Sequence, residues 1–115
     1  DASEEFKSTE SGLKYRVLRK SDKQKPSAQD SVQVHYKGWL DDKTIFDSSY
    51  RRGEKISFPL ANVIAGWTEG MQLIGEGGMI ELEIPAKLGY GARGVPGVIP
   101  PNSNLHFLVE LFDIQ

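Results

Sequence analysis

The sequence predicts an α+β domain in which an antiparallel sheet of about five strands wraps around one short helix. Three observations indicate this class. Most apolar residues alternate with polar ones, only one segment has helical spacing, and the connections are rich in Gly and Pro. The 115 residues are enough for one compact domain, which we expect over residues 12–115.

The predicted strands follow from alternation. In residues 31–40, Val32, Val34 and Tyr36 share one face, and polar residues separate them. The same reasoning predicts further strands at residues 13–18, 56–58, 79–84 and 105–114, and residues 44–46 are expected to be extended. Because polar residues occupy the other face of most of these strands, we expect the sheet to bury one side.

Residues 63–74 have the spacing of a helix. Their large apolar residues follow steps of three, four and three, and they are Ile64, Trp67, Met71 and Ile74. Asn62 is the predicted cap at the start. Gly66 and Gly70 each weaken a helix by roughly 1 kcal/mol relative to Ala, so we expect another element to pack closely against the backbone there.

Three segments are predicted to be irregular. Residues 1–11 are polar, and we interpret them as a tail or linker, or as part of a helix that continues upstream. Residues 47–53 are predicted to form a polar loop. Residues 85–104, rich in Gly and Pro, are expected to hold no regular structure.

Composition excludes several classes of function. A net charge of −2 offers no basic surface for nucleic acid, and the absence of Cys excludes disulfides, thiolate catalysis and Cys-type zinc sites. No apolar run is long enough to cross a bilayer, and no signal peptide begins the sequence. We expect a soluble domain without membrane insertion, in the cytoplasm or in the periplasm or secreted.

Residues 89–94 spell G-x-G-x-x-G, a dinucleotide-binding pattern, but they do not predict a nucleotide site. That pattern requires a helix to begin at the motif, and Pro96 and Pro100 follow too closely. The glycines are predicted to serve tight turns instead.

The remaining polar residues predict neither hydrolytic chemistry nor a metal site. His35 and His106 take the outward phase of their strands, so both are interpreted as lone surface histidines. Asp41, Asp42 and Asp47 lack the spacing of a calcium loop and are predicted to lie in a turn and a loop. We therefore expect no cofactor and no metal.

Six aromatic residues lie on five predicted elements, most in the inward phase: Tyr36, Phe46, Phe58, Trp67, Tyr90 and Phe107. They could simply form the core, where aromatic residues usually lie. Alternatively, the tyrosine hydroxyls could open onto a solvent-facing pocket. The pattern alone leaves both interpretations open.

Four short sequence segments favour the pocket, because they resemble segments of a known family. Residues 34–38 (VHYKG), 46–49 (FDSS), 63–70 (VIAGWTEG), and 89–91 (GYG) with 99–102 (IPPN) resemble the signature segments of the FKBP-type peptidyl-prolyl isomerases, in order and spacing. The resemblance covers residues 12–115. Residues 9–15 and 58–60 are similar to the bacterial macrophage infectivity potentiator branch, where an N-terminal helical segment often dimerises the protein. We expect the present domain alone to be monomeric.

The resemblance implies a proline-binding pocket between the concave sheet and the helix, with Trp67 as its floor. The Ile64 N–H and the Tyr90 hydroxyl would donate hydrogen bonds to the substrate, and Asp47 would lie beside Tyr36. The catalytic set implied is Tyr36, Phe46, Asp47, Trp67, Tyr90 and Phe107. The implied substrate-binding set is Ile56, Phe58, Val63, Ile64, Val95, Val98 and Ile99. Ile56 and Val95 depart from the aromatic residue and the histidine that the family often has there.

The resemblance further implies isomerisation of peptide bonds before proline, a rotamase activity in protein folding. Its substrates would be proline-containing polypeptides, and macrolides such as tacrolimus and rapamycin would bind the same pocket. A non-catalytic proline-peptide-binding or chaperone module is the main alternative, and a structural domain without a ligand is a third.

Overall fold

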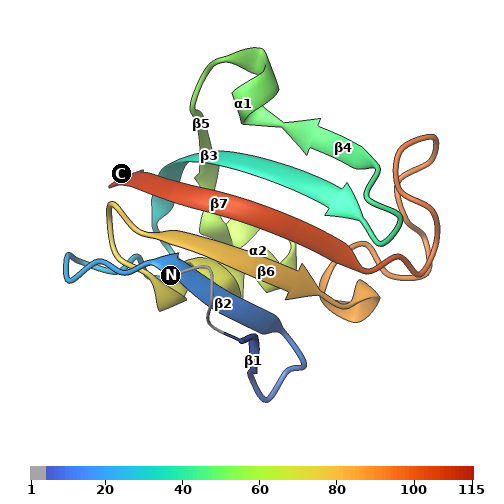
Figure 1. The fold of residues 1–115 in the computed structure, drawn as a ribbon, viewed down its shortest axis with the longest axis horizontal. Coiled ribbons are helices and arrows are strands. Elements are labelled where there is room, and N and C mark those ends of the chain that lie inside the picture. Colours follow the sequence, from blue (N-terminus) through green and yellow to red (C-terminus); the bar gives the residue numbers. More distant parts are fainter. Residues whose placement is uncertain (1–4) are drawn as a thin grey trace.

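The computed structural model describes residues 5–115, which form one antiparallel sheet and several short helices (Figure 1). The strand order is β1-β2-β6-β7-β3-β4, and β5 pairs with β3 beside β4. The strands are β1 (Lys7–Ser8), β2 (Lys14–Arg19), β3 (Ser31–Leu40), β4 (Ile45–Ser48), β5 (Ile56–Pro59), β6 (Met79–Ile84) and β7 (Leu105–Ile114).

This architecture confirms the predicted α+β class, and the sheet has seven strands where about five were predicted. β1 pairs with Lys14 and Tyr15 of β2, so residues 7 and 8 of the predicted tail are a strand and not part of a helix. Residues 1–4 of that tail lie outside the described residues. The domain boundary at residue 12 stays a prediction.

The central helix is shorter than predicted. α2 (Ala65–Gly70) is followed by the 3-10 helix η2 (Met71–Leu73), and Ile64 precedes it in an extended conformation with ψ of 150°. Asn62 does not cap α2, because it ends the separate 3-10 helix η1 (Leu60–Asn62). The chain turns into the helix two residues later than the apolar spacing indicated.

The close packing expected at the two helical glycines is confirmed. A Cβ on Gly66 would lie 2.7 Å from the side chain of Ile84, and one on Gly70 would lie 2.7 Å from that of Leu82. Both partners belong to β6. Glycine therefore allows the α2 backbone to lie directly against the inner face of the sheet, and this contact fixes the position of Trp67.

The segment predicted as a polar loop contains a further helix, so that prediction was wrong. α1 (Ser49–Arg52) is preceded by Ser48, whose hydroxyl accepts a hydrogen bond from the Arg51 N–H, and followed by Gly53, which has a φ of 75°. These are a serine N-cap and a left-handed glycine C-cap. Residues 85–104 are irregular apart from the short 3-10 helix η3 (Ala86–Leu88) and a bridge between Val95 and Ile99.

The core lies between the inner face of the sheet and α2. On β3 the inward residues Val32, Val34 and Tyr36 are all buried, as the alternation predicted. Within residues 5–115 we find no helix with both the length and the apolar character needed to cross a membrane.

Candidate active site

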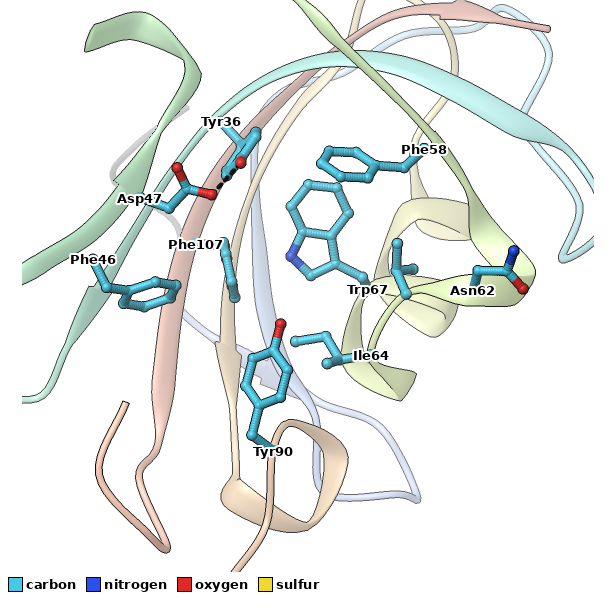
Figure 2. A pocket seen from close by; sticks show the side chains of 10 residues that line it. Tyr36, Phe46, Asp47, Phe58, Asn62, Ile64, Trp67, Tyr90 and Phe107 are labelled. Carbon is cyan, nitrogen blue, oxygen red and sulfur yellow. Dashed lines mark hydrogen bonds between the residues drawn. The ribbon is translucent and has the colours of Figure 1, made fainter. Parts of the chain in front are cut away.

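A cavity of about 430 Å³ opens between the inner face of the sheet and α2 (Figure 2). The residues that line it come from strands, helices and loops that are distant in the sequence. They are Tyr36, Phe46, Asp47, Phe58, Asn62, Val63, Ile64, Trp67, Tyr90 and Phe107. Most of these side chains are apolar, so a group that enters the cavity meets a mainly apolar surface.

Trp67 forms the floor of the cavity and is only 4% exposed. The rings of Tyr36, Phe58 and Phe107 each meet the indole edge to face, with centroids 5.4 Å away in all three cases. Edge-to-face packing is favourable for aromatic pairs, and three such contacts fix the indole plane. The floor is therefore rigid without any hydrogen bond to the described residues.

One corner of the cavity is polar: Tyr36 and Asp47 line it, and Arg52 contacts both of them from outside the lining. We call these three residues the polar corner. The Tyr36 hydroxyl donates to Asp47 Oδ2, and the Arg52 guanidinium donates to Asp47 Oδ1 at 2.5 Å and to the Tyr36 hydroxyl at 3.2 Å. The Ser48 N–H also donates to Asp47 Oδ1, at 2.9 Å. Both carboxylate oxygens are thus occupied by donors within the protein.

These contacts shift the pKa values of the corner in opposite directions. Burial raises the pKa of Asp47, but the hydrogen bonds from Tyr36 and Arg52 outweigh it, and the pKa lies below the ordinary aspartate value. Burial and the hydrogen bond to Asp47 raise the pKa of Tyr36. At neutral pH the corner therefore holds a carboxylate, a neutral phenol and a guanidinium.

Two hydrogen-bond donors on the opposite side of the cavity remain available. Tyr90 is 42% exposed, and its hydroxyl points into the cavity (Figure 2). Among residues 5–115, the Ile64 N–H has no backbone acceptor, because the chain is extended just before α2 begins. Both groups can donate to carbonyl oxygens of a bound ligand.

The structure brings together nine of the thirteen residues that the resemblance implied. The other four do not line this cavity. Ile99 is buried in the core, Ile56 and Val95 pack against the core while partly exposed, and Val98 is 50% exposed on its loop. Contact of these four with a bound ligand stays a prediction.

The sequence analysis missed two residues of the site. Asn62 was assigned to a helix cap, and it lines the cavity at the end of η1. Arg52 was assigned to a loop, and it reaches Asp47 and Tyr36 from the last turn of α1. A signal for Arg52 was present in the serine that can cap α1 and the glycine that can end it.

The two histidines have polar partners, so the prediction that they are lone residues was wrong. Both are half-buried, and His35 Nδ1 lies 2.8 Å from Ser49 Oγ while His106 Nε2 lies 2.7 Å from Asp41 Oδ1. In the part of the chain that the structure describes, no group of three His, Asp or Glu side chains is placed to hold a metal ion.

The fold and the aromatic cavity define a class of protein that sequence comparison also identifies. Residues 22–112 match the family model described as FKBP-type peptidyl-prolyl cis-trans isomerase, and the chain belongs to this family. A similar relative is the FKBP-type isomerase FkpA of Escherichia coli K12, 51% identical over 95% of this chain and 40% of that protein. The isomerase Mip of Coxiella burnetii is 43% identical over 95% of this chain and 47% of its own length.

Solved structures support the same assignment. The crystal structure of FkpA from Escherichia coli superposes with a TM-score of 0.93 at 50% identity, covering 99% of this chain and 54% of that one. The crystal structure of AtFKBP13 superposes with a TM-score of 0.87 at 32% identity, covering 96% and 99%. The chain thus spans less than half the length of the curated relatives described above.

Proposed function

We propose that this domain catalyses cis–trans isomerisation of peptide bonds that precede proline in polypeptides. The observation that carries the proposal is the cavity floored by Trp67 and walled by aromatic rings, whose apolar surface suits a proline ring. We also propose that this domain alone acts as a monomer.

Such a site can supply the reduction in the rotation barrier that the reaction requires. Rotation about a peptide bond must break amide resonance, at a barrier of roughly 18–20 kcal/mol. Uncatalysed X–Pro isomerisation takes tens to hundreds of seconds. Shortening this to about ten milliseconds requires a barrier roughly 5 kcal/mol lower, at about 1.4 kcal/mol per tenfold. No covalent bond forms or breaks, so the reaction requires no nucleophile.

Desolvation supplies the first part of that reduction. The twisted amide has lost its resonance, and its carbonyl is therefore less polar than in the planar state. An apolar wall disfavours the polar planar amide more than the twisted one, which is preferential binding of the transition state. Trp67, Phe46 and Phe107 provide this wall around the proline ring.

Hydrogen bonds to the flanking backbone supply the second part. The Ile64 N–H and the Tyr90 hydroxyl lie on one side of the cavity and donate to substrate carbonyls. They hold the chain around the proline in a turn from which rotation proceeds, so less conformational entropy is lost on reaching the transition state.

Asp47 acts on the shape of the site and does not act as a base. Its lowered pKa keeps it ionised, and Tyr36, Arg52 and the Ser48 N–H already occupy its oxygens. We propose that it orients the Tyr36 ring against the floor. Macrolides such as tacrolimus and rapamycin would occupy the same cavity in place of the proline ring.

The test is a refolding assay on a protein whose folding is limited by one trans-to-cis proline step, with and without tacrolimus. We expect acceleration that the drug abolishes. We also expect both Phe46→Ala and Asp47→Val to lower catalysis with the fold retained, and the loss to be smaller in Asp47→Val than in Phe46→Ala. Drug binding without acceleration would instead favour a proline-binding chaperone module, and full activity in both variants would refute the assignment of the site.

A further inference from the structure

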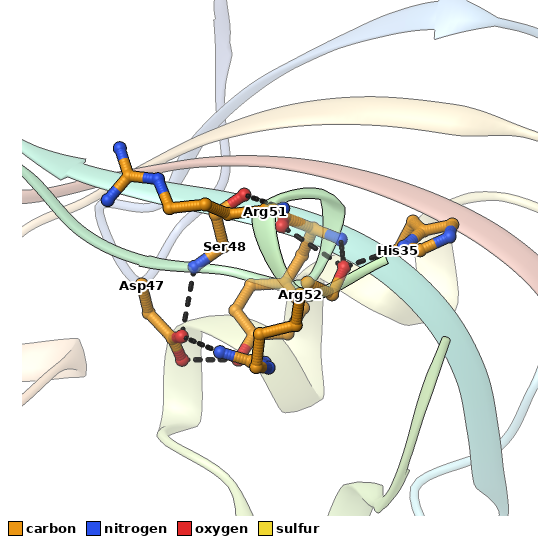
Figure 3. Close-up of polar contacts among 7 residues, drawn as sticks. His35, Asp47, Ser48, Arg51 and Arg52 are labelled. Carbon is orange, nitrogen blue, oxygen red and sulfur yellow. Dashed lines mark hydrogen bonds and ion pairs between the residues drawn. The ribbon is translucent and has the colours of Figure 1, made fainter. Parts of the chain in front are cut away.

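Ser49 lies directly behind the polar corner, at the first residue of α1, and its side chain is completely buried. Its hydroxyl accepts a hydrogen bond from the Tyr36 N–H at 2.7 Å and lies 2.8 Å from His35 Nδ1 and 3.3 Å from the Tyr36 carbonyl oxygen. Figure 3 shows this group of contacts beside Asp47 and Arg52. None of the roles assigned above uses this hydroxyl.

Ser49 stands at the place where regular pairing between β3 and β4 stops. The last paired residues are Lys37 and Ser48, after which the chain turns into α1. The Tyr36 N–H would otherwise lack an acceptor on that side of β3, and an unpaired buried N–H is costly. The Ser49 hydroxyl replaces the missing strand carbonyl and attaches the start of α1 to Tyr36.

The same four-residue helix also holds the other end of Tyr36. Arg52, in its last turn, donates to the Tyr36 hydroxyl and to Asp47. Tyr36 is thus held at its backbone by Ser49 and at its hydroxyl by the polar corner. A shift of α1 relative to β3 would loosen both contacts together.

His35 sets the direction of the Ser49 hydroxyl. When Nδ1 carries no proton it accepts the Ser49 hydroxyl proton; when Nδ1 is protonated it donates to Ser49 Oγ, and the hydroxyl proton goes to the Tyr36 carbonyl oxygen. In both tautomers a lone pair of Oγ remains for the Tyr36 N–H. The imidazole lies on the outer face of the sheet, where it stacks on Tyr50 at 4.7 Å and meets the edge of Phe112 at 5.7 Å. These rings hold it in place.

We propose that Ser49 and His35 are positioning residues for the isomerase site, which keep Tyr36 and α1 in the arrangement that binds proline. The proposal rests on the function proposed above. Loss of positioning reduces the fraction of free protein whose cavity is ready to bind. The apparent affinity is proportional to the fraction of free protein that is ready to bind, so it falls as that fraction falls. The complex, once formed, reacts as before. The expected signature is a higher KM at unchanged kcat.

The test compares two adjacent serines. For Ser49→Ala we expect the KM for a proline peptide and the Kd for tacrolimus to rise by the same factor, about fivefold, the scale of one hydrogen bond. The matched control is Ser48→Ala, which removes the helix cap but keeps the bond to Tyr36, and whose KM and Kd should rise by a smaller factor than those of Ser49→Ala. Hydrogen exchange of the Tyr36 amide should accelerate only in Ser49→Ala.

A second pair of variants tests His35 and does not depend on the folding of Ser49→Ala. Asn places an amide oxygen near the position of Nδ1, whereas Phe keeps the ring stacking without an acceptor. We expect His35→Phe to raise KM and Kd two- to threefold or more, on the order of part of one hydrogen bond, and His35→Asn to restore values near those of the wild type.

The outcomes separate the two proposals. A wild-type domain that does not isomerise proline peptides would refute the proposed function. An active wild type with equal KM values for the two serine variants would refute only the positioning role. A fall in kcat at unchanged KM would also refute it, because that pattern indicates a smaller folded fraction.

Discussion

The two sides of the cavity are built in different ways. The aromatic side, formed by Phe46, Phe58, Trp67 and Phe107, is held by ring packing between residues from β4, β5, α2 and β7. The polar corner of Tyr36, Asp47 and Arg52 is held by directional hydrogen bonds within a short stretch of chain from β3 to α1. Tyr36 belongs to the corner by its hydroxyl and to the aromatic side by its ring.

This difference separates two contributions to one reaction. Ring packing depends on volume and burial, so the aromatic side supplies the dry wall that the twisted amide needs. The polar corner depends on charge and hydrogen-bond geometry, so it fixes the position of the Tyr36 ring beside the floor of the cavity. We therefore expect changes on the aromatic side to reduce both stability and turnover, and changes in the corner to act on binding, with smaller effects.

The largest effect is expected from Trp67→Leu. The change removes the floor and its three edge-to-face contacts, so the free energy of unfolding should fall by about 2–4 kcal/mol, slightly less than for truncation to Ala. The value of kcat/KM at a temperature where the variant is folded should fall about tenfold or more. Urea unfolding and a peptide isomerisation assay measure the two quantities.

Trp39→Leu is the matched control for that experiment. Trp39 lies on the outer side of β3, where its ring stacks on His106 at 5.7 Å and away from the cavity. Its loss should leave kcat/KM within about twofold of the wild type, with a small cost in stability. Equal losses of activity in the two variants would contradict a special role for the cavity floor.

Most of the aromatic side could be predicted from the sequence. Alternation placed Tyr36 and Phe107 on inward faces, and helical spacing placed Trp67 on the face of α2 that meets the sheet. The glycines at 66 and 70 indicated the close contact that the structure contains. The start of α2 was misplaced because Ile64 fits the helical pattern but has an extended backbone. Periodicity describes side chains and does not report where the backbone turns.

Only part of the polar corner could be predicted from the sequence. The resemblance gave Asp47 beside Tyr36, but Arg52 depends on α1, which has only four residues. A helix this short is not stable by its own propensity, because nucleation is unfavourable and tertiary contacts must stabilise it. Those contacts join the buried Ser49 to Tyr36, which lies 13 residues earlier on a different element, β3. The local signal, a serine that can cap the helix and a glycine that can end it, was therefore too weak on its own to predict the helix or the role of its arginine.

A smaller effect, and one that depends on pH, is expected from Asp47→Asn. The folded pKa of Asp47 lies below its ordinary value of 3.8, so the carboxylate stabilises the fold above about pH 4, and this contribution is lost as pH falls through the folded pKa. Its side chain is 38% exposed, so solvent screening keeps the contribution below about 1 kcal/mol. Urea unfolding of both proteins from pH 7 to pH 3 measures the difference.

The difference in unfolding free energy between wild type and Asp47→Asn should be largest near neutral pH and should shrink below about pH 4. Asp42→Asn provides a comparison, because Asp42 also has a lowered pKa but lies in the turn after β3, outside the cavity. Only the change at Asp47 should also weaken macrolide binding at pH 7. A gap that widened on acidification would show that Asp47 is destabilising when ionised.

The smallest effect is expected from Arg52→Gln. The ion pair with Asp47 is exposed at both ends, 44% for the arginine side chain and 38% for the aspartate, and such pairs contribute about 0–1 kcal/mol. We expect KM to rise about twofold with kcat unchanged, and the difference from wild type to vanish near 1 M salt, where screening is strong. Arg51→Gln, one residue away, is the control, because the guanidinium that contacts Asp47 and Tyr36 is that of Arg52, and it should match the wild type at every salt concentration. A salt-independent loss in Arg52→Gln would mean that the guanidinium acts by packing against the Tyr36 ring, 5.9 Å away, and not by its charge.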